Sequence, residues 1–195
     1  MRLDVGCGDK PTGDVNVDVR VIKPSPPFFM RAYAKTLPFK SGVFDHLYAS
    51  HVLEHLGIME LDEVLEEWNR VLKPRGSLEI KCPNLRSISV LKAIFFAREF
   101  EKHGLKKIYG QSEDYPEDLH RSGFTPKIIR KLLSDHRFTD IDVTYLGEYT
   151  FLPFFKNHVI RYLYRKVRLT TFPKHFLDDL HVFARKSGSM KKGDK

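Results

Sequence analysis

The stretch RLDVGCGDKPTGDVNVDV, residues 2–19, places two short apolar runs on either side of a glycine-rich turn. Residues 3–5 and 15–19 have the apolar, β-branched composition of buried strands. The turn at residues 6–8, Gly-Cys-Gly, has the small residues that a tight change of direction requires. Hardly any crossover helix fits between the two runs. The pattern therefore predicts two neighbouring strands joined by one tight loop, which we call the glycine turn.

The glycine turn does not match the two common phosphate-binding loops. A dinucleotide-binding loop needs a third glycine and an acid about 20 positions further along, but position 11 is Pro11 and Asp18 follows Gly8 by only ten residues. A Walker loop needs Gly-Lys before Ser or Thr, which the sequence lacks. What remains is an acid, Asp4, before a turn that a ligand can approach, and Asp18, which suits two vicinal ribose hydroxyls. This set favours a nucleoside that carries an amine and a carboxylate.

The rest of the chain alternates strands and helices. Apolar patterns predict strands at residues 28–33, 44–49, 77–82, 140–146 and 180–184, and helices at 52–72, from 84 to about 102, and after Thr125-Pro126. The sequence KPRG at residues 73–76 is expected to end the first helix. Such alternation implies an α/β fold with a mainly parallel sheet covered on both faces, and ligands at the carboxyl ends of its strands.

Length and composition limit the class of protein. A chain of 195 residues fits one domain, which we place at residues 1–186, followed by a disordered tail at 187–195. No apolar run approaches the roughly 20 residues that span a bilayer, and no charged-then-apolar leader precedes the first strand, so we expect a cytoplasmic protein. Cys7 and Cys82 form neither a disulfide framework nor a zinc spacing, so no metal site is expected.

Three blocks of sequence resemble the class I S-adenosylmethionine-dependent methyltransferases. They are LDVGCG at residues 3–8, LPFKSGVFDHLYASHVLEHL at residues 37–56 and RVLKPRGSLEIKCPN at residues 70–84, and their order and spacing match. A further block, HRSGFTPKIIRKLL at residues 120–133, resembles a small prokaryotic subgroup often linked to glycan or cell-surface biosynthesis. The resemblance implies a Rossmann-like sheet with an antiparallel last strand. The N-terminal helices of the usual fold are truncated in this sequence.

The same resemblance implies a site for S-adenosylmethionine, with S-adenosylhomocysteine as the product. Asp4, Gly6, Cys7 and Gly8 would border the methionine part, Asp18 would hold the ribose, Leu37 would lie near the adenine, and Ser50 and His51 would close the pocket beneath the sulfonium. Relatives often carry an acid near the adenine where this chain has Tyr33. Either the cofactor binds weakly, therefore, or Tyr33 stacks on the base.

Methyl transfer needs the acceptor atom and the methyl group held in line and, for a hydroxyl acceptor, a base. The fourth predicted strand is followed by Ala-Ser-His rather than by the Asp/Asn-Pro-Pro-aromatic run associated with exocyclic amines. We therefore expect a hydroxyl of a small molecule or a glycan. His51 and His120 are the candidate catalytic bases, because neutral imidazole accepts protons near neutral pH. Without catalysis, His51 would be a hydrogen-bonding residue at a helix start and His120 a loop anchor. His55 is interpreted as a packed core histidine.

Residues 147–178 form a basic, aromatic insertion between the last two predicted strands, in the half of the chain that carries most of the net charge of +8. One helical stripe holds Val159, Leu163 and Val167, and another holds Arg161, Arg165 and Arg168. The insertion is interpreted as a lid helix, or as a surface for anionic lipid or a phosphate-bearing acceptor. No nucleic-acid-binding motif is present, so nucleic acid is not expected. A non-catalytic partner protein with this fold and a peripheral membrane-binding module remain open alternatives.

Overall fold

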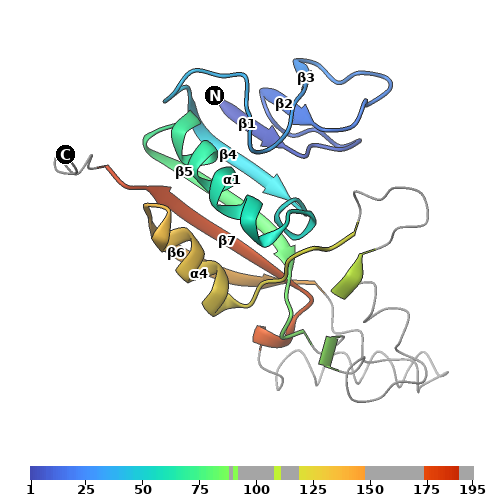
Figure 1. Cartoon of the computed structure of the whole chain (residues 1–195), viewed down its shortest axis with the longest axis vertical. Coiled ribbons are helices and arrows are strands. Elements are labelled where there is room, and N and C mark those ends of the chain that lie inside the picture. Colours follow the sequence, from blue (N-terminus) through green and yellow to red (C-terminus); the bar gives the residue numbers. More distant parts are fainter. Residues whose placement is uncertain (88–89, 92–107, 111–118, 148–173, 189–195) are drawn as a thin grey trace, which may run out of the picture.

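The computed structural model describes residues 1–87, 90–91, 108–110, 119–147 and 174–188. Within them, one sheet has the strand order β3-β2-β1-β4-β5-β7-β6 (Figure 1). Its strands are β1 Arg2–Val5, β2 Val15–Asp18, β3 Phe29–Arg31, β4 Phe44–Ser50, β5 Leu72–Pro83, β6 Phe138–Leu146 and β7 Asp179–Lys186. Strands β1 to β5 pair in parallel, and β7 runs antiparallel to both β5 and β6. This confirms the Rossmann-like sheet with an antiparallel last strand.

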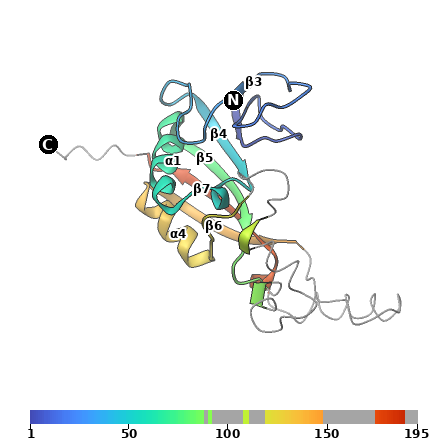
Figure 2. The ribbon, with the colours of Figure 1, turned by 45° about the vertical axis from the view of Figure 1, so that its right-hand side comes forward.

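Two α-helices pack on one face of this sheet. Helix α1 (Ile58–Val71) and helix α4 (Pro126–Asp135) lie on the same side in both views (Figures 1 and 2). Two short 3₁₀ helices, η1 (Leu53–His55) and η3 (Lys174–Phe176), complete the described elements. The buried side of α1 includes Leu65 and Trp68, which join one hydrophobic core with the strands. Helix α4 begins as its sequence predicts, because the Thr125 side chain accepts a hydrogen bond from the N–H of Ile128.

Within the described residues no α-helix covers the other face of the sheet; the expected coverage of both faces stays a prediction, because most of the helix predicted from residue 84 lies outside them. Leu78, Ile80 and Cys82 in β5 are buried, whereas Glu79 and Lys81 between them are only half-buried. This alternation is typical of a sheet with one apolar face and one polar face. No α-helix lies within residues 1–57, as the truncated N-terminal part predicts.

The polar face carries a paired cluster of side chains. Glu79 Oε1 lies 2.8 Å from Nε2 of His181, and its Oε2 lies 3.2 Å from Nε2 of His46. Nδ1 of His46 lies 2.8 Å from Oγ of Ser77. Burial, and then the positive charge of Arg2, lower the pKa of His46. Both oxygens of the Glu79 carboxylate are therefore engaged by imidazoles.

The first long helix begins and ends differently from its sequence pattern. The pattern predicted a helix from residue 52, but α1 begins at Ile58, after η1 and Gly57. The Gly57 N–H donates to Oε2 of Glu60 at 3.0 Å, which supports the helix start there. The KPRG sequence does not separate helix from strand, because Leu72 already pairs with Phe44 as the first residue of β5. Apolar periodicity alone does not mark these boundaries.

Three predicted regions lie wholly or mostly outside the described residues. The insertion at residues 147–178 falls almost entirely within residues 148–173, so the interpretation of Arg161, Arg165 and Arg168 as a lipid-facing or phosphate-facing stripe stays a prediction. Most of the helix predicted from residue 84 and the tail from 189 are outside them too. In the part of the chain that the structure describes, no helix is both long and apolar enough to cross a membrane.

Candidate functional site

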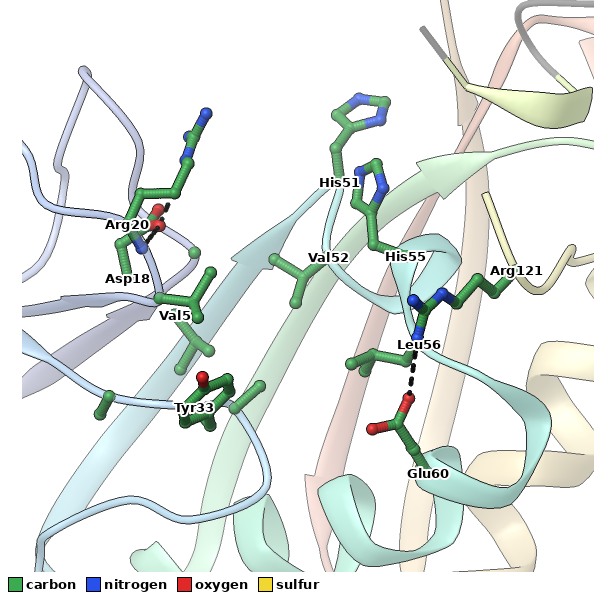
Figure 3. Close-up of a pocket in the computed structure, with 14 residues that line it drawn as sticks. Val5, Asp18, Arg20, Tyr33, His51, Val52, His55, Leu56, Glu60 and Arg121 are labelled. Atoms are coloured by element: carbon green, nitrogen blue, oxygen red, sulfur yellow. Dashed lines mark hydrogen bonds and ion pairs between the residues drawn. The ribbon is translucent and has the colours of Figure 1, made fainter. Parts of the chain in front are cut away.

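A cavity of about 260 Å³ opens where β1 to β4 end (Figure 3). Parallel strands place their carboxyl ends along one edge of a sheet, and this edge is where open α/β folds bind ligands. The carboxyl ends of β1, β2 and β4 contribute Gly6, Asp18 and His51 to the lining. The remaining lining residues are Val5, Val19, Arg20, Ala32, Tyr33, Ala34, Val52, His55, Leu56, Glu60 and Arg121.

The glycine turn forms one wall of this cavity. Gly6 has a φ of 69° and its N–H donates to the carbonyl of Val17 at 2.8 Å. A Cβ atom at Gly6 would lie 2.4 Å from Cγ2 of Val52, far inside van der Waals contact. Glycine is therefore required twice at this position, for its backbone conformation and for the close approach of the next segment.

Asp18 closes the glycine turn from the end of β2. Its carboxylate is only 4% exposed, and Oδ2 accepts the N–H of Gly8 at 2.9 Å. Oδ1 accepts the N–H of Arg20 at 2.8 Å, and the Arg20 guanidinium lies 3.4 Å away. Two carboxylate oxygens offer about four acceptor positions. Asp18 therefore orders the loop on both sides of it and keeps capacity for a hydroxyl donor from a ligand.

Five residues predicted to bind the cofactor do not line the cavity. They are Asp4, Cys7, Gly8, Leu37 and Ser50. Asp4 accepts both the N–H and the hydroxyl of Thr12 at 2.8 Å, and burial raises the pKa of its carboxyl. Leu37 lies in the hydrophobic core, where its N–H donates to Oε1 of Glu67 at 2.7 Å. Asp4 and Gly8 thus support the shape of the loop, and the binding role of all five stays a prediction.

His51 and Glu54 form a pair at the start of the segment between β4 and α1. His51 follows β4 with a φ of 54°, which is uncommon for a residue other than glycine. Its Nδ1 lies 2.9 Å from Oε1 of Glu54. Glu54 is 1% exposed, and its Oε2 is buried without a hydrogen-bond partner. Sequence reasoning missed Glu54, although the spacing of His51, Glu54 and His55 places all three within about one helical turn.

His55 and His120 lie against each other. Their ring centroids are 5.1 Å apart in an edge-to-face arrangement. His55 lines the cavity and is only half-buried, so its interpretation as a packed core histidine was wrong. His120 does not line the cavity, but it reaches the cavity rim through His55. Two of the three histidines considered from the sequence, His51 and His55, therefore border the cavity directly.

Residues 15–80, from β2 into β5, match a family described as a methyltransferase domain. This stretch resembles a methyltransferase domain, and the sheet around it has the class I methyltransferase fold. Among solved structures, a SAM-dependent methyltransferase from Archaeoglobus fulgidus is 19% identical, with a TM-score of 0.60 over 95% of this chain and 85% of that chain. One from Methanosarcina mazei is also 19% identical, with a TM-score of 0.61 over 96% of this chain and 92% of that chain. These two likenesses show the shared fold.

Phosphoethanolamine N-methyltransferase 2 of Haemonchus contortus, in complex with S-adenosyl-L-methionine, is 17% identical. Its TM-score is 0.56 over 95% of this chain and 48% of that chain. No curated protein sequence matches this chain. The matched stretch and the fold both resemble methyltransferases, and neither identifies a subgroup.

S-adenosylmethionine is the cofactor of methyltransferases with this fold, and the cavity has the chemistry to hold it. Tyr33, 61% exposed, offers an aromatic face at the cavity edge, and Asp18 offers acceptor oxygens. A second hollow of about 650 Å³ shares Val19, Arg20 and Tyr33 with the first. Together the two hollows have room for a nucleoside with an amino-acid arm.

The two cysteines of this chain are expected to be unreactive in the native state. Cys7 and Cys82 are both buried, and burial raises the pKa of Cys7 from 9.0 to about 12 and that of Cys82 well above its ordinary value. A rise of this size lowers the thiolate fraction of Cys7 at pH 8 by about a thousandfold. Labelling with a thiol reagent at pH 8 should therefore be slow in buffer and rapid for both residues in denaturant. Rapid native labelling of Cys7 would contradict its burial.

Proposed function

We propose that this methyltransferase transfers a methyl group from S-adenosylmethionine to a hydroxyl of a small molecule or a glycan. The observation that carries the proposal is the convergence of Gly6, Asp18 and His51 on one cavity from three different strand ends. Each supplies a separate requirement: a close backbone approach, an acceptor for ribose hydroxyls and an imidazole near the reacting end.

Different residues of the cavity would contact different parts of the cofactor. The sulfonium supplies an electrophilic methyl group, so the chain has mainly to position the two reactants. Asp18 would accept hydrogen bonds from the ribose, and Tyr33 would stack on the adenine. The Gly6 backbone would border the amino-acid arm. Arg121 and Glu60, which lie 3.8 Å apart on the opposite rim (Figure 3), would face the acceptor side.

His51 is the residue we propose as the base. A carboxylate only accepts hydrogen bonds, so the contact with Glu54 puts the imidazole proton on Nδ1. Nε2 is then the atom that can take a proton from an acceptor hydroxyl. The buried Glu54 also stabilises the imidazolium that forms, as a carboxylate does when it orients a catalytic histidine. His120 stays a candidate for contact with the acceptor, because it touches the cavity through His55.

Calorimetric titration with S-adenosylmethionine and S-adenosylhomocysteine tests the cofactor site. We expect both to bind the wild-type chain, and Asp18→Asn to weaken binding about 10- to 100-fold, because hydrogen bonds to a charged group contribute about 1.5–3 kcal/mol. Asp14→Asn is the matched control. Asp14 also accepts a backbone N–H, that of Arg2 at 2.7 Å, but it is exposed and does not line the cavity.

The control variant should bind both ligands as tightly as wild type. Absence of binding to the wild-type chain at millimolar ligand would overturn the proposed enzyme and favour the non-catalytic partner protein. Equal binding by Asp18→Asn and wild type would remove Asp18 from the ribose site. Once binding is established, methyl transfer to a panel of hydroxyl and amine acceptors distinguishes the proposed oxygen acceptor from a nitrogen acceptor.

A further inference from the structure

We propose that Glu54, His55 and His120 bind a divalent metal ion at the rim of the cofactor cavity. Among the residues that the structure describes, they are the only group of three His, Cys, Asp or Glu side chains whose potential ligand atoms all lie within 4.8 Å of one another. The sequence spacing gave no sign of a metal site, because His120 lies far along the chain from the other two. Metal binding itself does not depend on the proposed methyl transfer, but the catalytic role given to the ion below does.

Glu54 supplies the observation that points to a ligand. Its side chain is 1% exposed, and Oε1 is bonded to His51 while Oε2 has no partner. Burying a carboxylate oxygen without a partner is costly. The carboxylate of Glu79 on the polar sheet face is also enclosed by two histidines, but there both oxygens are engaged. A cation at Oε2 of Glu54 would satisfy the oxygen that the protein itself leaves unpaired.

His55 is held in the orientation of a metal ligand. Its Nδ1 lies 3.3 Å from the carbonyl oxygen of Leu119, and a carbonyl only accepts, so Nδ1 carries the proton. The lone pair is then on Nε2. Histidines that bind metals commonly donate their other N–H to a carbonyl or carboxylate, which fixes the tautomer and the ring. Leu119 therefore acts on His55 as an outer-shell partner would.

The backbone holds His120 against His55. The N–H groups of Arg121 and Ser122 both donate to the carbonyl of Glu54, at 2.7 and 3.1 Å, and the Ser122 hydroxyl donates to the carbonyl of Leu53 at 2.9 Å. The N–H of His120 donates to the carbonyl of Tyr109 at 3.0 Å. The chain after His120 is thus anchored to η1, the turn that carries the other two ligands, and Leu119 before it contacts His55 of the same turn.

Two imidazoles and one carboxylate favour a borderline transition metal, such as Zn²⁺ or Mn²⁺, over Mg²⁺ or Ca²⁺, which prefer oxygen ligands. At bond lengths of about 2.1 Å, ligand atoms around a metal lie about 3.0–3.5 Å apart. The widest pair here must therefore close by somewhat more than 1 Å, which small changes of side-chain torsion can supply. Three protein ligands leave positions for an acceptor or water.

The open positions suggest which acceptors the site would take. A hydroxyl beside a second oxygen, as in a vicinal diol or a hydroxy acid, can bind the ion through both oxygens and be fixed near the methyl group. The acceptor hydroxyl would give its proton to Nε2 of His51. Its oxygen then bonds to the methyl carbon, while the carbon–sulfur bond breaks and its electron pair stays on sulfur.

The test is titration of the untagged, chelator-treated chain with Zn²⁺, Mn²⁺ and Mg²⁺ alone, followed by calorimetry and, for Mn²⁺, by electron paramagnetic resonance. We expect one Zn²⁺ or Mn²⁺ per chain and much weaker Mg²⁺. His120→Ala and Glu54→Gln should each weaken the binding at least 100-fold. His46→Gln, which also removes a histidine beside a carboxylate, is the matched control and should bind as wild type.

His120 is outside the hydrophobic core, so His120→Ala should keep the fold even if Glu54→Gln does not; near-ultraviolet circular dichroism checks both. Absence of saturable binding, or equal binding by wild type and His120→Ala, would overturn the proposed metal site. Titration of the metal-free chain with S-adenosylmethionine separates the two proposals. A chain that binds the cofactor but no metal refutes only the metal site, and a chain that binds metal but no cofactor refutes only the methyltransferase site.

Discussion

Replacing Gly6 with alanine is expected to abolish measurable binding of S-adenosylmethionine and to destabilise the fold. The left-handed backbone at φ 69° costs a residue with a Cβ about 1–2 kcal/mol. The added Cβ would also lie 2.4 Å from Cγ2 of Val52, and forced overpacking costs about 1–3 kcal/mol more. Because Gly6 and Val52 both line the cavity, relief of the clash must displace a cavity wall. Calorimetry and urea unfolding measure the two effects.

Gly42 provides the matched control for this variant. Its φ of 68° is nearly the same, but a Cβ there would have no atom within 4 Å. Gly42→Ala therefore isolates the cost of the backbone conformation, about 1–2 kcal/mol, and should leave cofactor affinity unchanged. If Gly6→Ala binds the cofactor as tightly as Gly42→Ala does, the glycine turn does not form the cofactor site.

Trp68→Ala is expected to cause the largest loss of stability, about 3–5 kcal/mol, because the side chain is fully buried in the core between α1 and the sheet. The effect should reach the cavity too. The indole N–H of Trp68 donates to the carbonyl of Ala34 at 3.1 Å, and Ala34 lines the cavity together with Gly6 and Asp18. Core packing and the position of the cavity wall are thus coupled through this one hydrogen bond.

Trp68→Phe separates the two contributions of the indole. Phenylalanine keeps most of the buried ring but cannot donate to Ala34, so we expect a loss of about 1–2 kcal/mol with a measurable fall in cofactor affinity. Unfolding has to be followed by far-ultraviolet circular dichroism, because Trp68 is the only tryptophan of the chain. A cost below 1 kcal/mol for Trp68→Ala would contradict its place in the core.

The features that the sequence predicts well depend on neighbours along the chain. The glycine turn, the strands around it and the start of α4 at Thr125-Pro126 follow from local propensity and spacing, and the structure has them where expected. The antiparallel last strand was anticipated through resemblance to a family, because periodicity does not give strand direction. Asp18 and His51 were predicted from their places at the ends of predicted strands, and both line the cavity.

The features that the sequence could not predict depend on contacts between distant segments. His55 has the spacing of a buried helical residue, yet it borders the cavity because α1 begins only at Ile58. The approach of His120 to His55 rests on backbone hydrogen bonds from Arg121 and Ser122, which no side-chain pattern encodes. The half-buried Glu79 and Lys81 mark a polar sheet face, a signal that was present in the alternation of β5 but weighed less than the alternation of elements.

Because β1, β2 and β3 are short, the stability of this edge of the sheet is expected to depend on whether a ligand fills the cavity. These strands have three or four residues each, and the first 57 residues contain no α-helix to pack on them. A ligand in the cavity touches the segments that follow β1, β2 and β3. A ligand that binds only when these strands are paired stabilises the paired form by mass action. Cofactor supply in the cell would thereby set how often this edge opens to proteases, and hence how long the protein survives.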